Sequence, residues 1–150
     1  MTVNHIKIRP ATKKDITEIL ELLYDLERPR PKNKSEKTLF EKQIMLYLTD
    51  NDKKILVSES DSRLVGMVSM IFISKLNRTN PELYIPELVV AKDQRRSGIG
   101  KLLMNSCIDM AKKKKCFRLR LESGHQRKDA HRFYTKLHFE QSALTYTKKL

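Results

Sequence analysis

A basic turn with two glycines comes closer than any other part of the chain to specifying a chemistry. It reads Arg95-Arg96-Ser97-Gly98-Ile99-Gly100-Lys101, and it separates an apolar, strand-like run from a pattern of helical period. Glycine lets a ligand approach the backbone closely, and the free N–H groups at a helix start attract phosphate. The turn therefore predicts a site for the phosphates of a nucleotide-like cofactor.

Two common phosphate loops do not fit this turn. A dinucleotide loop needs three glycines and an acidic residue about 20 positions further on, and a nucleoside-triphosphate loop ends in Gly-Lys-Ser or Gly-Lys-Thr. Neither pattern is present here. On its own residues, the turn is equally compatible with an ordinary surface loop.

The surroundings of the turn carry a family resemblance. The segment from Tyr84 to Met104 resembles the central motif of the GNAT superfamily, the acetyl-CoA-dependent N-acetyltransferases: an apolar strand, a loop with Arg-x-x-Gly-x-Gly spacing and a helix with two leucines. The segment from Ala130 to Phe139 is similar to a second family element, and Ile8 to Thr12 with Asp15 resembles the family's opening. With the order of elements included, the resemblance covers essentially the whole chain.

The resemblance implies how acetyl-CoA, the expected co-substrate, would bind. The backbone of Leu88, Val89 and Val90 would pair with the pantetheine arm as if the arm were another strand. The amides of the turn would bind the pyrophosphate, beside the positive charges of Arg95, Arg96 and Lys101. No metal is expected, because the chain has no Cys/His cluster at metal-ligand spacing.

Two titratable residues are candidates for catalysis. Tyr134 corresponds to the family tyrosine near the coenzyme sulfur, and a phenol with a pKa of about 10 can donate a proton to a leaving thiolate. Glu87 directly precedes the cofactor strand, where a carboxylate can take a proton from the acceptor amine. The alternatives are a core aromatic for Tyr134 and an exposed glutamate paired with basic residues for Glu87.

The acceptor side is predicted from the loop between the first two helices. In the family this region shapes the acceptor site, and here, from about Arg28 to Phe40, it is strongly basic. Like-charge repulsion disfavours polycations such as aminoglycosides or polyamines. The loop suits an acceptor with a carboxylate or phosphate, or an acidic protein segment, although a solvated loop would look the same.

Two residues depart from the family pattern. His138 stands at the usual glycine position after the tyrosine helix, and histidine enters left-handed geometry more readily than most residues. Arg127 stands where many members have an asparagine that contacts the coenzyme, so that contact is not expected here.

The net charge of the chain is also compatible with other functions. The 150 residues include 31 basic and 18 acidic side chains, a net charge of +13, which favours anionic partners. A basic nucleic-acid-binding module is therefore an alternative, although no aromatic stacking platform or reading helix is recognisable. The lysine run 112–115 suits a solvated helix C-terminus. A non-catalytic acyl-CoA-binding sensor is a further alternative, since the phosphate turn would serve it too.

Other sequence features concern location and assembly. Cys107 and Cys116 read as reduced thiols rather than a disulfide framework. The N-terminus lacks the apolar run of a signal peptide, and no segment has the roughly 18 apolar residues of a membrane span. A cytoplasmic protein without membrane contact is expected. The sequence leaves both a monomer and a homodimer open.

Periodicity and turn residues predict the elements that position these groups. Strands are expected at 3–9, 54–60, 64–74, 83–90 and 116–121, with one or two more in 139–150. Helices are expected from a Thr12/Asp15 capping box to about Leu26, and at 36–48, 98–113 and 129–137. The inner face of the second helix is predicted to be Leu39, Phe40, Ile44 and Tyr47, and that of the third Ile99, Leu102, Leu103, Ser106 and Met110.

The predicted order is β-α-α-β-β-β-α-β-α-β. Strands and helices mixed in one unit of this length predict an α/β (α+β) fold with helices on both faces of the sheet. The resemblance implies a GNAT-like mixed, largely antiparallel twisted sheet. One N-acetyltransferase domain over residues 1–150 is expected, because no linker or composition boundary interrupts the chain.

Overall fold

A computed structural model describes residues 5–150, which form two compact units. The first unit ends at Arg120 and the second runs from Leu121 to Leu150. Val3 and Asn4, which begin the first predicted strand, lie outside the described residues. The expectation of one domain over the whole chain stays a prediction.

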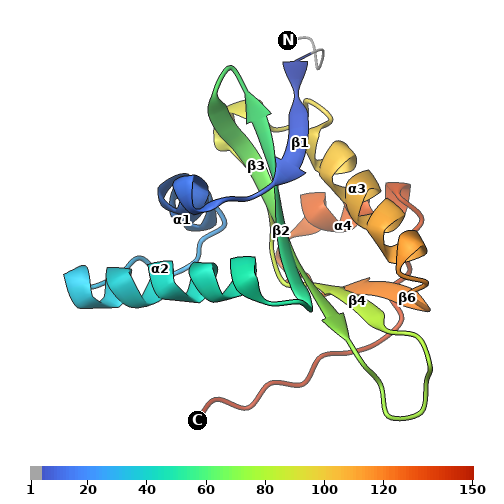
Figure 1. Ribbon diagram of the computed structural model, residues 1–150. Coiled ribbons are helices and arrows are strands. Elements are labelled where there is room, and N and C mark those ends of the chain that lie inside the picture. The colour runs from blue at the N-terminus through green and yellow to red at the C-terminus, as the bar shows by residue number, and fades with distance from the viewer. Residues whose placement is uncertain (1–4) are drawn as a thin grey trace. The chain divides into compact units, whose positions relative to one another are not determined.

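A six-stranded sheet forms the centre of the first unit (Figure 1). Its antiparallel pairs join β1 (Lys7–Pro10) to β2 (Lys53–Ser60) and β2 to β3 (Arg63–Ile73). β3 then pairs antiparallel with both β4 (Glu82–Ile85) and β5 (Leu88–Val90), and β6 (Arg118–Leu121) lies next to β4. The predicted, largely antiparallel sheet is confirmed.

The helices of the first unit cover both faces of this sheet. α1 (Ile16–Asp25) and α2 (Lys34–Thr49) lie on one side and α3 (Ile99–Lys113) on the other (Figure 1). The core on the α1 side joins Ile19 and Leu20 to Val57 and Met67. Helices on both faces are therefore confirmed for this unit. Among residues 5–150, no helix has the length and apolar character needed to cross a membrane.

Capping residues set where the first two helices begin. Thr12 and Asp15 form the predicted capping box, with the Thr12 amide donating to Asp15 Oδ2 at 2.7 Å, ahead of a short 3-10 turn η2 (Lys13–Asp15) and α1. α2 begins two residues before the predicted start, because the Asn33 side chain accepts from the Glu36 amide at 2.9 Å.

The inner faces of two helices differ in part from the prediction. Leu39 was expected inside, but 62% of it is exposed. In α3 the fully buried side chains include Met104 and Cys107, which the predicted stripe omitted, whereas Leu102, Ser106 and Met110 are only half-buried. Because strands in a sheet are twisted, the residues of a helix that are buried against them differ in part from those that ideal helical spacing predicts.

The predicted strand 83–90 is wrong as one element, because it divides into β4 and β5 around Pro86 and Glu87. Proline has no N–H to donate to a ladder, which favours a break there. β3 bridges the break by pairing with both halves: Ile71 lies opposite Tyr84, and Met67 lies opposite Val89.

A buried carboxylate ties β4 to β6. Glu82 is fully buried, and its two oxygens each accept a bond of 2.6 Å, one from Arg118 Nε and one from Arg120 Nε. Lys75 Nζ lies 3.9 Å from the same group. Burial acts to raise the pKa of Glu82, but the bonds from Arg120 and Arg118 outweigh it and hold the pKa below its ordinary value.

The second unit contains α4 (Lys128–Lys136) and an extended tail. His138 has a φ of 65°, its amide donates to Thr135 O, and the Phe139 amide donates to Tyr134 O, each at 3.0 Å. This pattern is a Schellman cap, so the expected left-handed geometry of His138 is confirmed. The predicted strands in 139–150 are wrong, since these residues form none; a segment without a pairing partner does not form a stable strand.

Candidate active site

The break between β4 and β5 places Glu87 against β3. The Ser69 amide donates to the Glu87 carbonyl oxygen at 2.9 Å, and the Glu87 amide donates to Ser69 Oγ at 3.0 Å. The Ser69 hydroxyl in turn donates to Glu87 Oε2. Glu87 is thus held through both its backbone and its side chain, while 26% of its side chain stays exposed.

A cation lies beside this carboxylate, and the Glu87 charge also acts on Tyr47. Arg28 Nη2 lies 3.9 Å from Glu87 Oε1 and donates to the Pro86 carbonyl at 3.4 Å. Burial raises the pKa of Tyr47 to about 12, and the charges of Glu87 and Tyr84 act in the same direction. Tyr47 is therefore neutral at neutral pH.

One edge of β5 has no strand partner among residues 5–150, because β5 pairs with β3 alone and β6 follows β4. The Ser69-to-Glu87 bond and a bond of 2.9 Å from the Ala91 amide to Val65 O point residues 87 and 91 toward β3. By the alternation of antiparallel strands, Val89 also points its backbone groups toward β3. Leu88 and Val90 then direct theirs to the unpaired edge.

The predicted phosphate turn, Arg95 to Lys101, follows this strand. A 3-10 turn η3 (Lys92–Gln94) leads into it, and α3 starts within it, at Ile99. Arg96 and Gly98 have φ values of 63° and 88°, both left-handed, and left-handed residues in a turn are typical of backbone concavities that bind anions. Gly98 is the N-cap residue, and the first amides of α3 have no acceptor within the helix.

Side-chain bonds hold the turn in place. Both guanidinium amines of Arg63 donate to Asp93 at 2.8 Å, which fixes η3 to the β2–β3 hairpin. The Ser97 hydroxyl donates to Gln94 O. The Arg95 side chain donates to the Val90 and Asp25 carbonyls at 3.2 and 3.3 Å, so its guanidinium joins β5 to the end of α1. These bonds hold the turn to the hairpin, to β5 and to the end of α1.

The second unit presents Tyr134 on α4 in an aromatic cluster. Its ring makes edge contacts with Phe133 and Phe139, with ring centroids 5.2 and 5.7 Å apart. Burial raises the pKa of Tyr134, and the positive charge of Arg127 opposes that shift in part. Tyr134 is therefore protonated at neutral pH, as a proton donor must be.

Comparison with known proteins decides the family. The model of the acetyltransferase (GNAT) family matches residues 17–139, which include Glu87, the turn and Tyr134. The chain belongs to the GNAT family. It is an N-acetyltransferase, and acetyl-CoA is the co-substrate of such enzymes.

One curated relative agrees with this assignment, and solved structures share the fold. An aminoalkylphosphonate N-acetyltransferase of Salmonella typhimurium is 28% identical over 96% of this chain and 91% of its own length. A Bacillus halodurans structure titled as a transcriptional regulator is 26% identical and superposes with a TM-score of 0.89, covering 97% of this chain and all of that one. A metagenomic aminoglycoside acetyltransferase, 17% identical, shares the fold with a TM-score of 0.80 over 99% and 98% of the chains.

Sequence reasoning missed the partners of Glu87 in this N-acetyltransferase. Ser69 is one of two residues in the β3 run Leu64–Ile73 that are not apolar, and it is buried. A serine inside such a run is a signal, because a buried hydroxyl needs a partner. Tyr47 was expected on an inner helix face and is half-buried, but nothing in the spacing indicated its proximity to Glu87.

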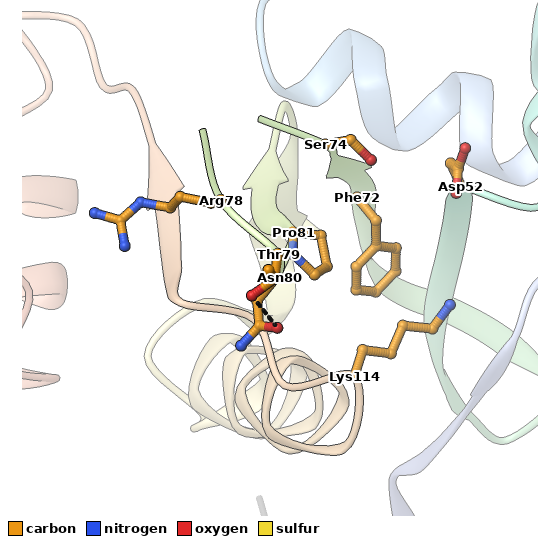
Figure 2. Close-up of a pocket in the computed structure, with 8 residues that line it drawn as sticks. All are labelled: Asp52, Phe72, Ser74, Arg78, Thr79, Asn80, Pro81 and Lys114. Atoms are coloured by element: carbon orange, nitrogen blue, oxygen red, sulfur yellow. Dashed lines mark hydrogen bonds between the residues drawn. The ribbon is translucent and has the colours of Figure 1, made fainter. Parts of the chain in front are cut away.

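A separate surface pocket of about 330 Å³ lies at the end of β3 and of α3 (Figure 2). Phe72, Pro81 and Lys114 line it, and Lys114 Nζ lies 4.4 Å from the centre of the Phe72 ring. None of the predicted site residues lines this pocket. This pocket is therefore separate from the strand break and from the turn.

Proposed function

We propose that the enzyme transfers acetyl from acetyl-CoA directly to the primary amine of a small acceptor that also carries an anionic group. The observation that carries the proposal is the pair of Glu87 and Arg28, whose charged atoms lie 3.9 Å apart. An acceptor with an amine at one end and an acid group at the other matches this pair. The name of the Salmonella relative specifies an acceptor of this kind, an aminoalkylphosphonate.

Acetyl-CoA would lie along β5 and the turn that follows it. The outward backbone groups of Leu88 and the Val90 amide are suited to pair with the pantetheine amides, since Arg95 already donates to the Val90 carbonyl. Of the expected contacts at residues 88–90, those of Leu88 and Val90 are therefore proposed. The amides of residues 96–101 and the α3 N-terminus would bind the pyrophosphate. Arg95 would hold the turn to β5, while Arg96 and Lys101, both exposed, would add positive charge.

Glu87 would act as the general base. It takes a proton from the ammonium group, and the neutral nitrogen then attacks the carbonyl carbon of the thioester. The carbon–sulfur bond breaks, the sulfur leaves as a thiolate, and the remaining extra N–H proton passes to solvent. Holding the amine beside the thioester would supply a large share of the rate.

Tyr134 would donate its phenolic proton to the thiolate. The proposal rests on the match of Phe133-Tyr134 to the family element and on the raised pKa of Tyr134, which keeps the phenol protonated. A proton from solvent restores the phenol after coenzyme A leaves.

The basic loop between α1 and α2, residues 28–34, supports an acceptor that carries an anionic group. Arg28 is half exposed, and Arg30 stacks on Tyr24 with its guanidinium carbon 4.5 Å from the ring centre. The exposed Lys32 and Lys34 follow. A phosphonate or carboxylate would be attracted to this basic loop, whereas a polyamine would be repelled by it.

The test is acetyl transfer to a matched panel of amines. Purified enzyme and acetyl-CoA are combined with 2-aminoethylphosphonate, β-alanine, propylamine and spermidine, and free thiol is measured. The proposal expects kcat/KM for the two acidic amines to exceed that for propylamine at least roughly tenfold, with spermidine lowest, since one ion pair of this kind contributes that much. Equal values for propylamine and the acidic amines, or a preference for spermidine, would overturn it.

A further inference from the structure

Ser69 occupies a position where its polarity is not explained by packing. It lies in β3 between Val68 and Met70, both of which are fully buried, and only 2% of Ser69 is exposed. A hydroxyl at such a position needs a hydrogen-bonding partner. The two partners of its hydroxyl both belong to Glu87, one in the backbone and one in the side chain.

The Ser69 hydroxyl fixes which carboxylate oxygen of Glu87 is available. It donates to Oε2, while Oε1 is the oxygen that lies 3.9 Å from Arg28. The same hydroxyl oxygen accepts from the Glu87 amide, so backbone and side chain are constrained together. A carboxylate held at one oxygen cannot rotate freely about its terminal bond.

We infer that Ser69 is the positioning residue for Glu87: by binding Oε2 and the Glu87 amide, it presents Oε1 to the acceptor amine. This inference rests on the proposed role of Glu87 as the general base. Because only 2% of Ser69 is exposed, its proposed role is to orient Glu87 rather than to contact the acceptor or the coenzyme. It acts by keeping the base in the orientation from which a proton can be taken.

The position of Ser69 at the strand break strengthens the inference. β3 pairs with β4 at residues 71–73 and with β5 at residues 66–68, so Ser69 lies between the two ladders. The hydrogen bond from the Ser69 amide to the Glu87 carbonyl extends the β3–β5 ladder by one residue. Pro86 supplies no N–H at the break. The hydroxyl therefore replaces ladder contacts that the break removes.

A matched pair of variants distinguishes the effect of the hydroxyl from the effect of side-chain volume. Ser69→Thr keeps the hydroxyl, whereas Ser69→Val introduces a side chain of the same shape as threonine but without the hydroxyl. We expect Ser69→Val to lower kcat about tenfold relative to Ser69→Thr, as a loosened base would. The KM for acetyl-CoA should agree within about twofold, because the coenzyme turn is untouched. Ser69→Ala is the second apolar variant in case the added methyl disturbs folding, and thermal unfolding checks all three.

Repeating the Ser69 variants in a Glu87→Gln background tests whether Ser69 affects kcat through Glu87. If Ser69 acts through the base, Ser69→Val and Ser69→Thr should differ by less than about twofold there, because coupled residues are non-additive. An equal loss in both backgrounds, or no difference between the Thr and Val variants with active Glu87, would overturn the inference. Unchanged kcat in Glu87→Gln alone would instead overturn the proposed base, and the role of Ser69 with it.

Discussion

Arg28 Nη2 lies 3.9 Å from Glu87 Oε1 and also donates to the carbonyl of Pro86, the residue that ends the β4 ladder. This contact joins the end of the α1 region to the strand break. It places a cation beside the proposed base without burying either charge, since half of the Arg28 side chain is exposed. The guanidinium can therefore exchange this long ion pair for an anionic group on an incoming amine.

Replacing Arg28 should weaken selection for acidic acceptors. In Arg28→Gln we expect KM for 2-aminoethylphosphonate to rise roughly 10- to 100-fold, as losing a charge-assisted contact would cause. The kcat/KM for propylamine should change less than about threefold. Arg78→Gln is the matched control, because Arg78 lines the separate pocket and stacks on Phe117, with its guanidinium carbon 4.0 Å from the ring centre. Equal losses for both amines, or an equal effect of Arg78→Gln, would contradict this role.

Replacing Tyr134 should separate the chemical step from coenzyme binding. Tyr134→Phe removes only the hydroxyl and keeps the edge contacts with Phe133 and Phe139. Loss of a general acid lowers turnover by about 100-fold or more. The Kd for acetyl-CoA, measured by calorimetry, should stay within about threefold. Unchanged turnover would remove Tyr134 from the proton-transfer step.

Gly98 should be required for its backbone conformation rather than for space. Its φ is 88°, and a Cβ added there would meet no atom within 4 Å. Gly98→Ala should lower the free energy of unfolding by about 1 kcal/mol, the cost of left-handed geometry in a residue with a Cβ. Coenzyme affinity should fall with it, as the amides of the turn lose their alignment. Gly98→Asn should lose less stability and less coenzyme affinity than Gly98→Ala, since asparagine adopts the left-handed region more readily than alanine. Alanine and asparagine variants that bind acetyl-CoA like the parent would show that this φ is dispensable.

The sequence predicted the parts of the site that depend on neighbours along the chain. The turn from Arg95 to Lys101 and the cap at Thr12 and Asp15 are local, because glycine conformation and capping bonds involve residues a few positions apart. His138 belongs here too: its left-handed φ follows from its place after a helix end. Such features are readable before the fold is known.

The parts that were missed depend on distant partners. Residues 83–90 were predicted as one strand because apolar residues flank Pro86 and Glu87 on both sides; Pro86 favours a break, but only the fold shows that β3 pairs with the two halves separately. Ser69 lies 18 residues from Glu87, so its bonds could not be derived from spacing. The tail beyond Phe139 was predicted to contain strands, but a ladder needs a second strand, and local residues do not show whether one lies alongside.

Asp15 should make stability depend on acid pH. Two bonds from the Arg9 guanidinium, at 2.7 and 2.9 Å, hold the pKa of Asp15 below its ordinary value of 3.8; burial opposes the shift, and the Thr12 amide adds to it. A carboxyl whose pKa is lower in the folded than in the unfolded chain contributes stability above the unfolded pKa. That contribution is lost as the pH falls through the folded pKa.

The measurement compares urea unfolding of the parent and Asp15→Asn between pH 2 and 6, a window chosen to span about two units on either side of the carboxyl pKa. At pH 6 we expect the variant to be less stable by about 3 kcal/mol, because it breaks a largely buried ion pair. The difference between the two proteins should shrink below about pH 4, as the parent's carboxyl becomes protonated. Asp50→Asn is the control, since Asp50 lies at the exposed end of α2, 3.9 Å from Lys53. A stability difference that stays constant across this range would show that the charge of Asp15 does not stabilise the fold.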